Sequence, residues 1–189
     1  MGFTRRDFVD RALKGSVLAL SFEMGGASLL LTPKQARAQD VPLRNLDETQ
    51  ARRIEILGGT IVTGAVDAGL VHFLDHQMGV DPDDALLLCK YFNVRPPYIN
   101  FYGAGLEIAA GLSNEVVGKP IEDLNAEEAQ QLVRAMGNPE LLVDGFPVFL
   151  FYMCLRSDAV DVVYGTPEGF RKLNIPYMEH IMPPEGWDG

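Results

Sequence analysis

The sequence contains few of the residues that build metal centres and disulfide frameworks. Among its 189 residues are two cysteines, three histidines and one tryptophan. Two cysteines are too few for a disulfide scaffold or for a self-contained zinc site with four cysteine ligands. The spacing Cys-x-x-Cys-His, which attaches c-type haem covalently, does not occur either. The chain is therefore neither a disulfide-stabilised mini-protein nor a cytochrome c.

Basic residues are outnumbered by acidic ones, 16 Lys and Arg against 26 Asp and Glu, and the formal net charge is −10. Because phosphate contacts need clustered Lys and Arg, nucleic acid is not expected among the partners. With 47% hydrophobic and 22% charged residues, the chain is neither disordered nor a multi-span membrane protein. Its length suits one domain with a substantial core.

The charge is distributed unevenly along the chain. Residues 1–38, which we call the leader, carry six basic and three acidic side chains. Residues 39–189, which we call the body, carry the remaining 10 basic and 23 acidic side chains and thus a net charge of −13. A basic leader therefore precedes a strongly acidic body, and this division predicts two segments with different roles.

The start of the leader has the layout of an export signal. Arg5 and Arg6 are followed by Phe8, and this arrangement resembles a twin-arginine translocation signal. That pathway moves folded proteins, typically those that take up a cofactor in the cytoplasm. Either the body binds a cofactor itself, or it travels with a protein that does. The leader thus predicts a periplasmic location, reached through the twin-arginine translocase.

The rest of the leader predicts a cleavable signal peptide. A moderately apolar stretch runs from residue 15 to residue 31, and Ala36 and Ala38 then supply the small-x-small pattern that signal peptidase recognises. An uncleaved membrane anchor is the alternative, but a spanning helix needs about 20 predominantly apolar residues. This stretch is short and contains Glu23 and the pair Gly25-Gly26. We therefore expect the leader to be a twin-arginine signal peptide and the body to be the mature domain.

The body has the pattern of an all-α domain. Capping boxes that begin at Asp47 and Asn125 predict helix starts, and apolar residues recur at helical spacing after the first. A run of acidic residues predicts the helix that it opens over residues 85–92. The apolar segment from Phe146 predicts a buried helix that runs to about residue 163. From Tyr164 onward, frequent Gly and Pro predict an irregular tail on a single compact helical domain.

Two histidines are spaced to share one helical face. His72 and His76 are four residues apart with Asp75 beside them, a spacing that can hold a metal ion. A zinc protease needs Glu directly after the first His, and Phe73 stands there. A stand-alone periplasmic helical protein that binds a ligand or metal through His72 and His76 is the alternative to the function that the resemblance below implies.

Other motifs carry less information about function. Cys89 and Cys154 each lie in an apolar segment, and the sequence leaves open whether they are buried thiols or a disulfide. We expect a loop and a helix start at Gly103 and Gly105, because Ile108 occupies the third glycine position of a dinucleotide-binding turn. Neither Gly-x-Ser-x-Gly nor a phosphate-binding loop occurs. We therefore expect no catalytic, cofactor-binding or metal-binding residues in this chain.

Aromatic residues and methionines are concentrated in the tail, among prolines and glycines. Exposed aromatic and Met side chains are typical of partner surfaces. A tail that folds back onto the core of its own chain is the alternative. The candidate interface residues are Tyr164, Phe170, Tyr177, Met178 and Trp187.

Four segments near the C-terminal end resemble one known family. They are Phe149–Arg156, Asp158–Phe170, Leu173–Met178 and Pro183–Trp187, and they include the runs Tyr-Gly-Thr-Pro-Glu-Gly and Pro-Tyr-Met. These segments resemble the gluconate 2-dehydrogenase subunit 3 family. The twin-arginine leader and the helical middle fit the same family, so the resemblance covers nearly the whole chain.

The resemblance implies a non-catalytic small (gamma) subunit of a periplasmic, membrane-bound dehydrogenase complex. In such complexes the large subunit is a flavoprotein of the glucose–methanol–choline oxidoreductase type that carries FAD. A multihaem cytochrome c subunit passes electrons to the respiratory chain. The small subunit supplies the export signal for the flavoprotein and supports the assembled complex. This chain is then expected to be the accessory subunit of an acceptor-linked gluconate 2-dehydrogenase, held at the inner membrane through its partners.

Overall fold

Helices make up most of the molecule. The structure is a computed structural model and describes residues 19–174. Its elements in chain order are β1 (Leu20–Met24), β2 (Ala27–Leu31), α2 (Pro33–Ala38), α3 (Glu48–Ile61), α4 (Leu70–Gly79), the 3₁₀ helix η1 (Leu88–Phe92), α5 (Tyr98–Val116), the 3₁₀ helix η2 (Ile121–Asp123), α6 (Ala126–Met136), β3 (Leu142–Val143), β4 (Phe146–Pro147), α7 (Val148–Tyr164) and α8 (Pro167–Lys172). The expectation of a mostly helical fold is confirmed. The all-α prediction is wrong in detail, because two short antiparallel hairpins, β1–β2 and β3–β4, accompany the helices.

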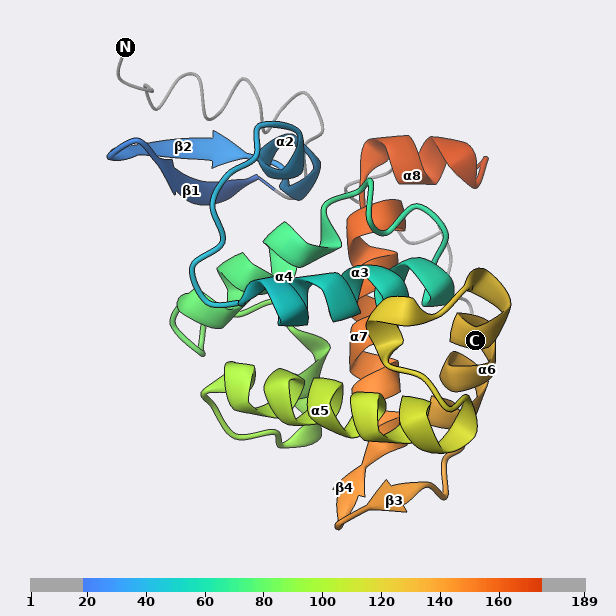
Figure 1. Ribbon diagram of the computed structural model, residues 1–189. Coiled ribbons are helices and arrows are strands. Elements are labelled where there is room, and N and C mark those ends of the chain that lie inside the picture. Colours follow the sequence, from blue (N-terminus) through green and yellow to red (C-terminus); the bar gives the residue numbers. More distant parts are fainter. Residues whose placement is uncertain (1–18, 175–189) are drawn as a thin grey trace, which may run out of the picture.

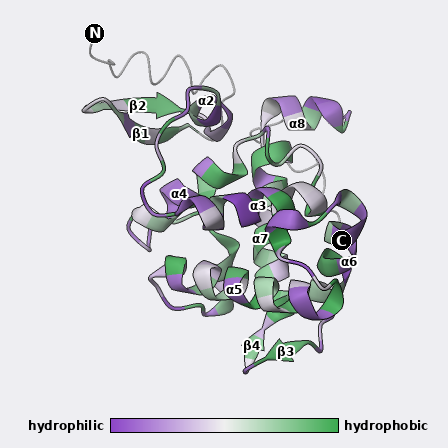
Figure 2. Ribbon diagram, viewed as in Figure 1, coloured by the Kyte–Doolittle hydropathy of each residue, from purple (hydrophilic) through white to green (hydrophobic). Residues whose placement is uncertain are grey.

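Helix α7 forms the centre of the fold. It contacts α3, α4, α5, α6, α8 and η1, and the other helices surround it (Figure 1). Phe151, Leu155 and Ala159 of α7 are fully buried. A helix that is apolar on most sides belongs in a core, and hydrophobic colouring follows much of α7 (Figure 2). The buried helix that the sequence predicts to about residue 163 is confirmed.

Two capping boxes begin helices where the sequence predicts them. Asp47 accepts a hydrogen bond from the Gln50 N–H at 2.8 Å, and the Gln50 side chain accepts one from the Asp47 N–H at 3.1 Å. Asn125 and Glu128 make the same reciprocal pair at α6, at 3.0 and 2.9 Å. Each box satisfies backbone donors that the first turn of a helix leaves unpaired. Helices α3 and α6 therefore start where local chemistry places them.

The helix expected over residues 85–92 does not form. The Leu86 N–H donates to the side chain of Gln77 in α4 at 2.7 Å, and this bond draws the segment away from a helical path. Ala85 and Leu87 are buried on either side of the exposed Leu86, the alternation of an extended chain. Only the 3₁₀ helix η1 follows, from Leu88. The prediction was wrong because a tertiary hydrogen bond outweighed a local helix-start signal.

Helix α5 begins earlier than expected, at Tyr98, directly after Pro97. Gly103 and Gly105 therefore lie inside a helix, and the loop expected at them is wrong. A Cβ atom at position 105 would lie 2.3 Å from the ring of Phe151. Glycine allows this ring to pack on the backbone of α5, and that contact joins α5 to the central helix.

The buried apolar residues form two separate clusters. Within the described range, the larger comprises 27 residues, which lie between Leu46 and Val163 and fill the space around α7. The smaller lies under the β1–β2 hairpin and α2. Its members are Phe22, Leu31, Ala36 and Val41.

The β1–β2 hairpin is not among the elements that the sequence predicts. Its strands pair antiparallel, with Leu20 opposite Leu31 at the open end. Gly25 and Gly26 make the two-residue turn with φ of +58° and +78°, a left-handed conformation that glycine adopts without strain. The glycine pair that interrupts the apolar stretch of the leader is thus a hairpin turn.

Candidate functional site

The described part of the leader is folded against the body. Residues 19–38, which we call the leader cap, form β1, β2 and α2 and lie together over one side of α4 (Figure 1). Helix α2 packs on the start of α4, where a Cβ atom at Gly69 would lie 2.2 Å from the Pro33 carbonyl oxygen. Gly69 also has φ of +86°, so glycine serves both the backbone conformation and the close approach. The surface under the leader cap and the pocket beside it, which we together call the α4 face, are made of Val41, Leu43, Val71, His72 and His76.

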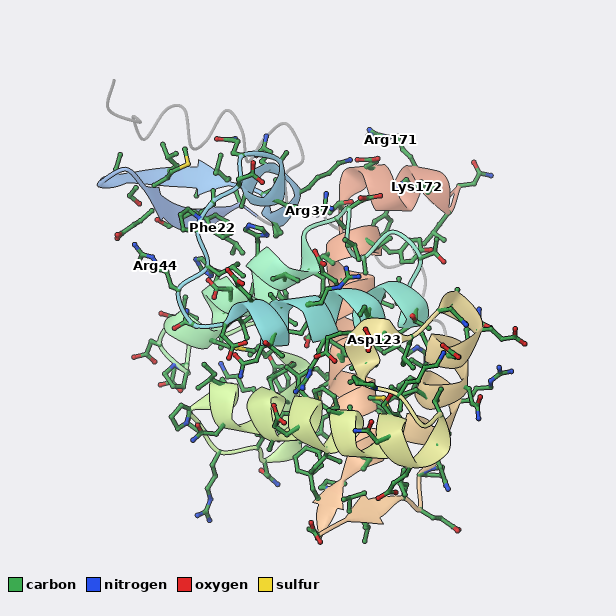
Figure 3. All side chains as sticks on the ribbon, viewed as in Figure 1. Phe22, Arg37, Arg44, Asp123, Arg171 and Lys172 are labelled. Atoms are coloured by element: carbon green, nitrogen blue, oxygen red, sulfur yellow. The ribbon has the colours of Figure 1, made fainter. Side chains whose placement is uncertain are left out.

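Two histidines lie at the centre of this contact. The ring centroids of Phe22 and His76 are 5.2 Å apart, and Figure 3 shows Phe22 between β1 and α4. His72 donates from Nε2 to the Val41 carbonyl at 3.1 Å, and its buried Nδ1 has no hydrogen-bond partner among residues 19–174. Burial lowers the pKa of both histidines below the ordinary value of 6.5. Both rings are therefore neutral at pH 7 and pack as partly apolar groups.

The segment that connects the leader cap to α3 is fixed to α4 by one carboxylate. The Asp75 side chain accepts hydrogen bonds from the backbone N–H groups of Arg44, Asn45 and Leu46, at 3.0, 2.7 and 2.9 Å. The Asn45 side chain donates in return to the Asp75 carbonyl at 2.7 Å. Asp75 is 5% exposed, so these bonds satisfy a buried polar group. The carboxylate beside the two histidines thus anchors the backbone of residues 44–46 to α4.

Ion pairs connect the rim of the leader cap to the body. Three such pairs occur among residues 19–174; the leader cap supplies the cation in two of them and the anion in one. Most of the side chains involved are more than half exposed, so each pair adds little to stability and serves mainly to orient the two surfaces. The pairs are Lys34–Glu168 at 3.2 Å, Arg37–Asp67 at 3.6 Å and Glu23–Arg44 at 2.5 Å.

The predicted cleavage residues lie in α2. Ala36 is fully buried, whereas Ala38 ends the helix with its side chain exposed. Proteases act on backbone that is accessible or locally unfolded. Cleavage after Ala38, which stays a prediction, therefore requires α2 to leave the α4 face first. The predicted export-signal residues lie outside the described residues; they are Arg5, Arg6 and Phe8.

The histidines of the α4 face have protein partners of their own. His72 bonds to the Val41 carbonyl, and His76 packs against Phe22. Asp75 is engaged by backbone N–H groups. Across the described range, 19–174, no three His, Cys, Asp or Glu side chains are grouped so that they could hold a metal ion. The engaged rings give no support to the ligand or metal site considered for His72 and His76.

A buried carboxyl group lies within the larger cluster. Asp158 of α7 is fully buried and accepts a hydrogen bond from the hydroxyl of Tyr102 in α5. Its Oδ1 atom has no partner in the part of the chain that the structure describes. Burial is the main cause that raises the pKa of Asp158 to about 7. This carboxyl group thus ties α5 to α7 and changes its charge near neutral pH.

The two cysteines are free thiols buried near this carboxyl group. Burial, together with the nearby charge of Asp158, raises the pKa of Cys89 to about 12 and also raises that of Cys154. Both thiols are therefore protonated and unreactive at neutral pH. Of the two alternatives that the sequence leaves open, the structure contains the buried thiols.

The first part of the expected irregular tail is helical. Thr166 accepts a hydrogen bond from the Gly169 N–H at 3.0 Å and begins α8 with a proline after it, two helix-start signals that outweigh the local glycine. The irregular-tail prediction is thus wrong for α8. Tyr164 and Phe170 are both partly buried. The other candidate interface residues lie outside the described residues; they are Tyr177, Met178 and Trp187.

Several apolar side chains that sequence reasoning did not single out are exposed on the body. Tyr91 is 75% exposed and lies with Leu86 and Phe92 in the segment that fails to form an α-helix. Leu142, 63% exposed, belongs to the β3–β4 hairpin. Residues 85–89 are all apolar, so no alternation in the sequence distinguishes the exposed Leu86 from its buried neighbours.

No family model, curated protein or solved structure matches this chain. Among the helices of residues 19–174, none is both long enough and apolar enough to cross a membrane. The features of the chain that bear on its function are therefore the leader, the α4 face and the segment at which α7 ends and α8 begins.

Proposed function

We propose that this chain is the non-catalytic small subunit of a periplasmic, FAD-dependent dehydrogenase complex of the gluconate 2-dehydrogenase type. In this proposal the leader carries the folded flavoprotein subunit through the twin-arginine translocase. The body then supports a complex with the flavoprotein and a multihaem cytochrome c subunit. Association with the inner membrane comes through these partners, and the chain itself binds neither FAD nor haem.

The observation that carries this proposal is a leader with paired arginines attached to a body that has its own core. Arg5 and Arg6 supply the translocation motif in the sequence. Among residues 19–174, the larger buried cluster draws its members from the body alone, so the body can be folded while the leader is still attached. A translocase that accepts folded cargo suits such a chain, because a folded body can hold a folded partner during transport.

The residues that resemble the small-subunit family form a specific corner between α7 and α8. A Cβ atom at Gly165 would lie 2.5 Å from the Asp161 carbonyl oxygen. One at Gly169 would lie 2.4 Å from the Cα atom of Tyr164. Glycine alone fits these two close approaches. The run Tyr-Gly-Thr-Pro-Glu-Gly, on which the resemblance partly rests, therefore determines the backbone path at this corner.

Replacing the paired arginines tests the escort role. We expect the double variant Arg5→Lys, Arg6→Lys, made in the native host, to retain the flavoprotein in the cytoplasm. Periplasmic dye-linked dehydrogenase activity should fall by about tenfold or more, because the motif is read by the translocase. FAD fluorescence and activity are measured in both cell fractions. Arg11→Lys, a leader arginine outside the pair, is the matched control and should change neither. Normal export of the flavoprotein in the double variant would sink the proposal.

A further inference from the structure

The leader cap occupies a surface that the body does not need covered in order to fold. None of the buried members of the larger cluster comes from the leader cap, and only Leu20 packs on its edge. The smaller cluster takes Val41 alone from the body. Burial of apolar surface is the dominant favourable contribution to folding. The body therefore retains its core when the leader cap is removed.

Two pockets that are open to solvent lie at the edge of the contact between the leader cap and the body. One, of about 330 Å³, lies between α2, α3 and α4, and Arg37 is the leader-cap residue in its wall. The other, of about 160 Å³, lies between β1 and α4 beside Phe22 and His76. The ion pairs at the rim are exposed to solvent and add little to stability. The leader cap is thus held in a way that permits exchange for another chain.

Removal of the leader would leave an apolar surface with a rim that carries both signs of charge, because Arg44 would lose Glu23. Its centre would be the α4 face, which Phe22 and α2 now cover. At its edge, Asp67 and Glu168 would lose the cations Arg37 and Lys34. A surface that covers the α4 face again needs an apolar side chain at its centre, basic side chains beside Asp67 and Glu168, and an acidic side chain beside Arg44.

The order of events decides which partner can use this surface. Under the proposed function, the flavoprotein joins the chain in the cytoplasm, while the leader is attached and the leader cap covers the α4 face. The flavoprotein must therefore bind elsewhere on the body. The cytochrome c subunit meets the chain on the periplasmic side, where the leader is removed, so it is the partner that finds the α4 face uncovered.

We propose that the α4 face is the docking surface for the cytochrome c subunit and that the leader cap keeps it covered until cleavage after Ala38. The subunit presents an apolar side chain in place of Phe22, basic side chains in place of Lys34 and Arg37, and an acidic side chain in place of Glu23. This inference rests on the proposed function and adds an order of assembly to it, flavoprotein first and cytochrome second.

A variant that keeps its leader tests the order of assembly. The full-length chain with a C-terminal affinity tag is purified from membranes of the native host, and bound FAD and haem are quantified. Ala38→Leu removes the small residue that signal peptidase needs, and because Ala38 is exposed, α2 tolerates the change. Mass spectrometry verifies that the leader is retained. We expect FAD as in the wild type and a haem-to-FAD ratio that is lower by about tenfold or more.

Loosening the leader cap in that background provides a rescue. Phe22→Ala removes the ring that packs on His76. When Phe22→Ala is combined with Ala38→Leu, part of the bound haem should return, because the leader cap then dissociates from the α4 face more often. Two results would overturn the proposal that the leader cap blocks docking. One is a chain that keeps its leader and still binds haem as the wild type does. The other is a loss of haem that Phe22→Ala does not relieve.

Charge reversal on the cleaved chain tests the surface directly. Asp67→Lys with Glu168→Lys replaces the acidic side chains of the rim, and we expect FAD to be kept and haem to fall by about tenfold or more. Glu127→Lys is the matched control at an exposed position of α6, across the molecule from the leader cap (Figure 1), and should keep both. An unchanged haem-to-FAD ratio in the double variant overturns the docking surface. A wild-type complex without FAD overturns the proposed function instead, so the two failures are distinguishable.

Discussion

The leader cap and the body are held together in different ways. The body buries 27 residues in one cluster, and the ring of Phe151 interlocks with the backbone at Gly105. The leader cap has a small cluster that it shares with Val41, one ring contact to His76 and a rim of exposed ion pairs. Loss of a core contact should therefore weaken the whole body, whereas loss of a rim contact should release the leader cap alone. The body is thus expected to be the more stable of the two regions.

The largest expected effect is in the body. Phe151→Ala removes a fully buried ring that packs on Gly105 and contacts Tyr102 edge to face. Truncation of a buried Phe costs about 3–5 kcal/mol, and we expect the free energy of unfolding in urea to fall by that amount. Phe149→Ala, at a partly exposed position of the same helix, is the control and should cost about 1 kcal/mol. Equal losses for the two variants would contradict a single dense core.

The next effect depends on pH and also concerns the body. Because the pKa of Asp158 is raised from 3.8 to about 7, the stability that this group contributes is complete below pH 3.8 and is lost as pH rises through about 7. Asp158→Asn keeps an acceptor for the Tyr102 hydroxyl and cannot ionise. We expect its stability relative to wild type to rise by about 1–3 kcal/mol between about pH 5 and about pH 8.5, by urea unfolding, because the wild-type carboxyl group ionises in the folded protein over this range. Asp123→Asn, at an exposed position of η2, should follow the wild-type profile. Parallel profiles for Asp158→Asn and wild type would refute the buried ionisation.

The smallest effect concerns the leader cap, and pH acts on it in the opposite direction. Because the pKa values of His72 and His76 are lowered from 6.5, their contribution is complete above pH 6.5 and is lost as pH falls below it. In the uncleaved chain, we expect amide exchange in residues 20–31, corrected for intrinsic rates, to speed up by less than about tenfold between about pH 7.5 and 5.5. His76→Gln should reduce that change, whereas exchange in α7 should slow over the same pH range as Asp158 becomes protonated. A hairpin that becomes better protected on acidification would contradict this contrast between the two regions.

Local signals in the sequence predicted several of the helices. The capping boxes at Asp47 and Asn125 place α3 and α6, because a cap and its helix are neighbours in the chain. The acidic run after residue 80 is an equally good local signal, and it fails because Gln77 takes the Leu86 N–H. That hydrogen bond depends on how α4 lies against the following segment, which no local pattern contains.

The structure of the leader cap and its contact with α4 could not be predicted from the sequence. The pair Gly25-Gly26 is a hairpin signal, yet within an apolar stretch behind an export motif it also fits an interrupted signal-peptide core. The spacing of His72 and His76 correctly predicts a shared helical face. The role of that face could not be predicted, because Phe22 and the backbone acceptor at Val41 come from distant parts of the chain.

The three backbone hydrogen bonds to Asp75 limit how far a newly made chain end can move. Cleavage after Ala38 would create an α-amino group on Gln39, five residues before Arg44, the first of the anchored residues. An extended chain spans about 3.4 Å per residue, so this group stays within about 17 Å of its anchor. At neutral pH it is mostly protonated. Maturation would thus place a tethered positive charge at the edge of the α4 face, and a partner that docks there meets this charge only on a processed chain.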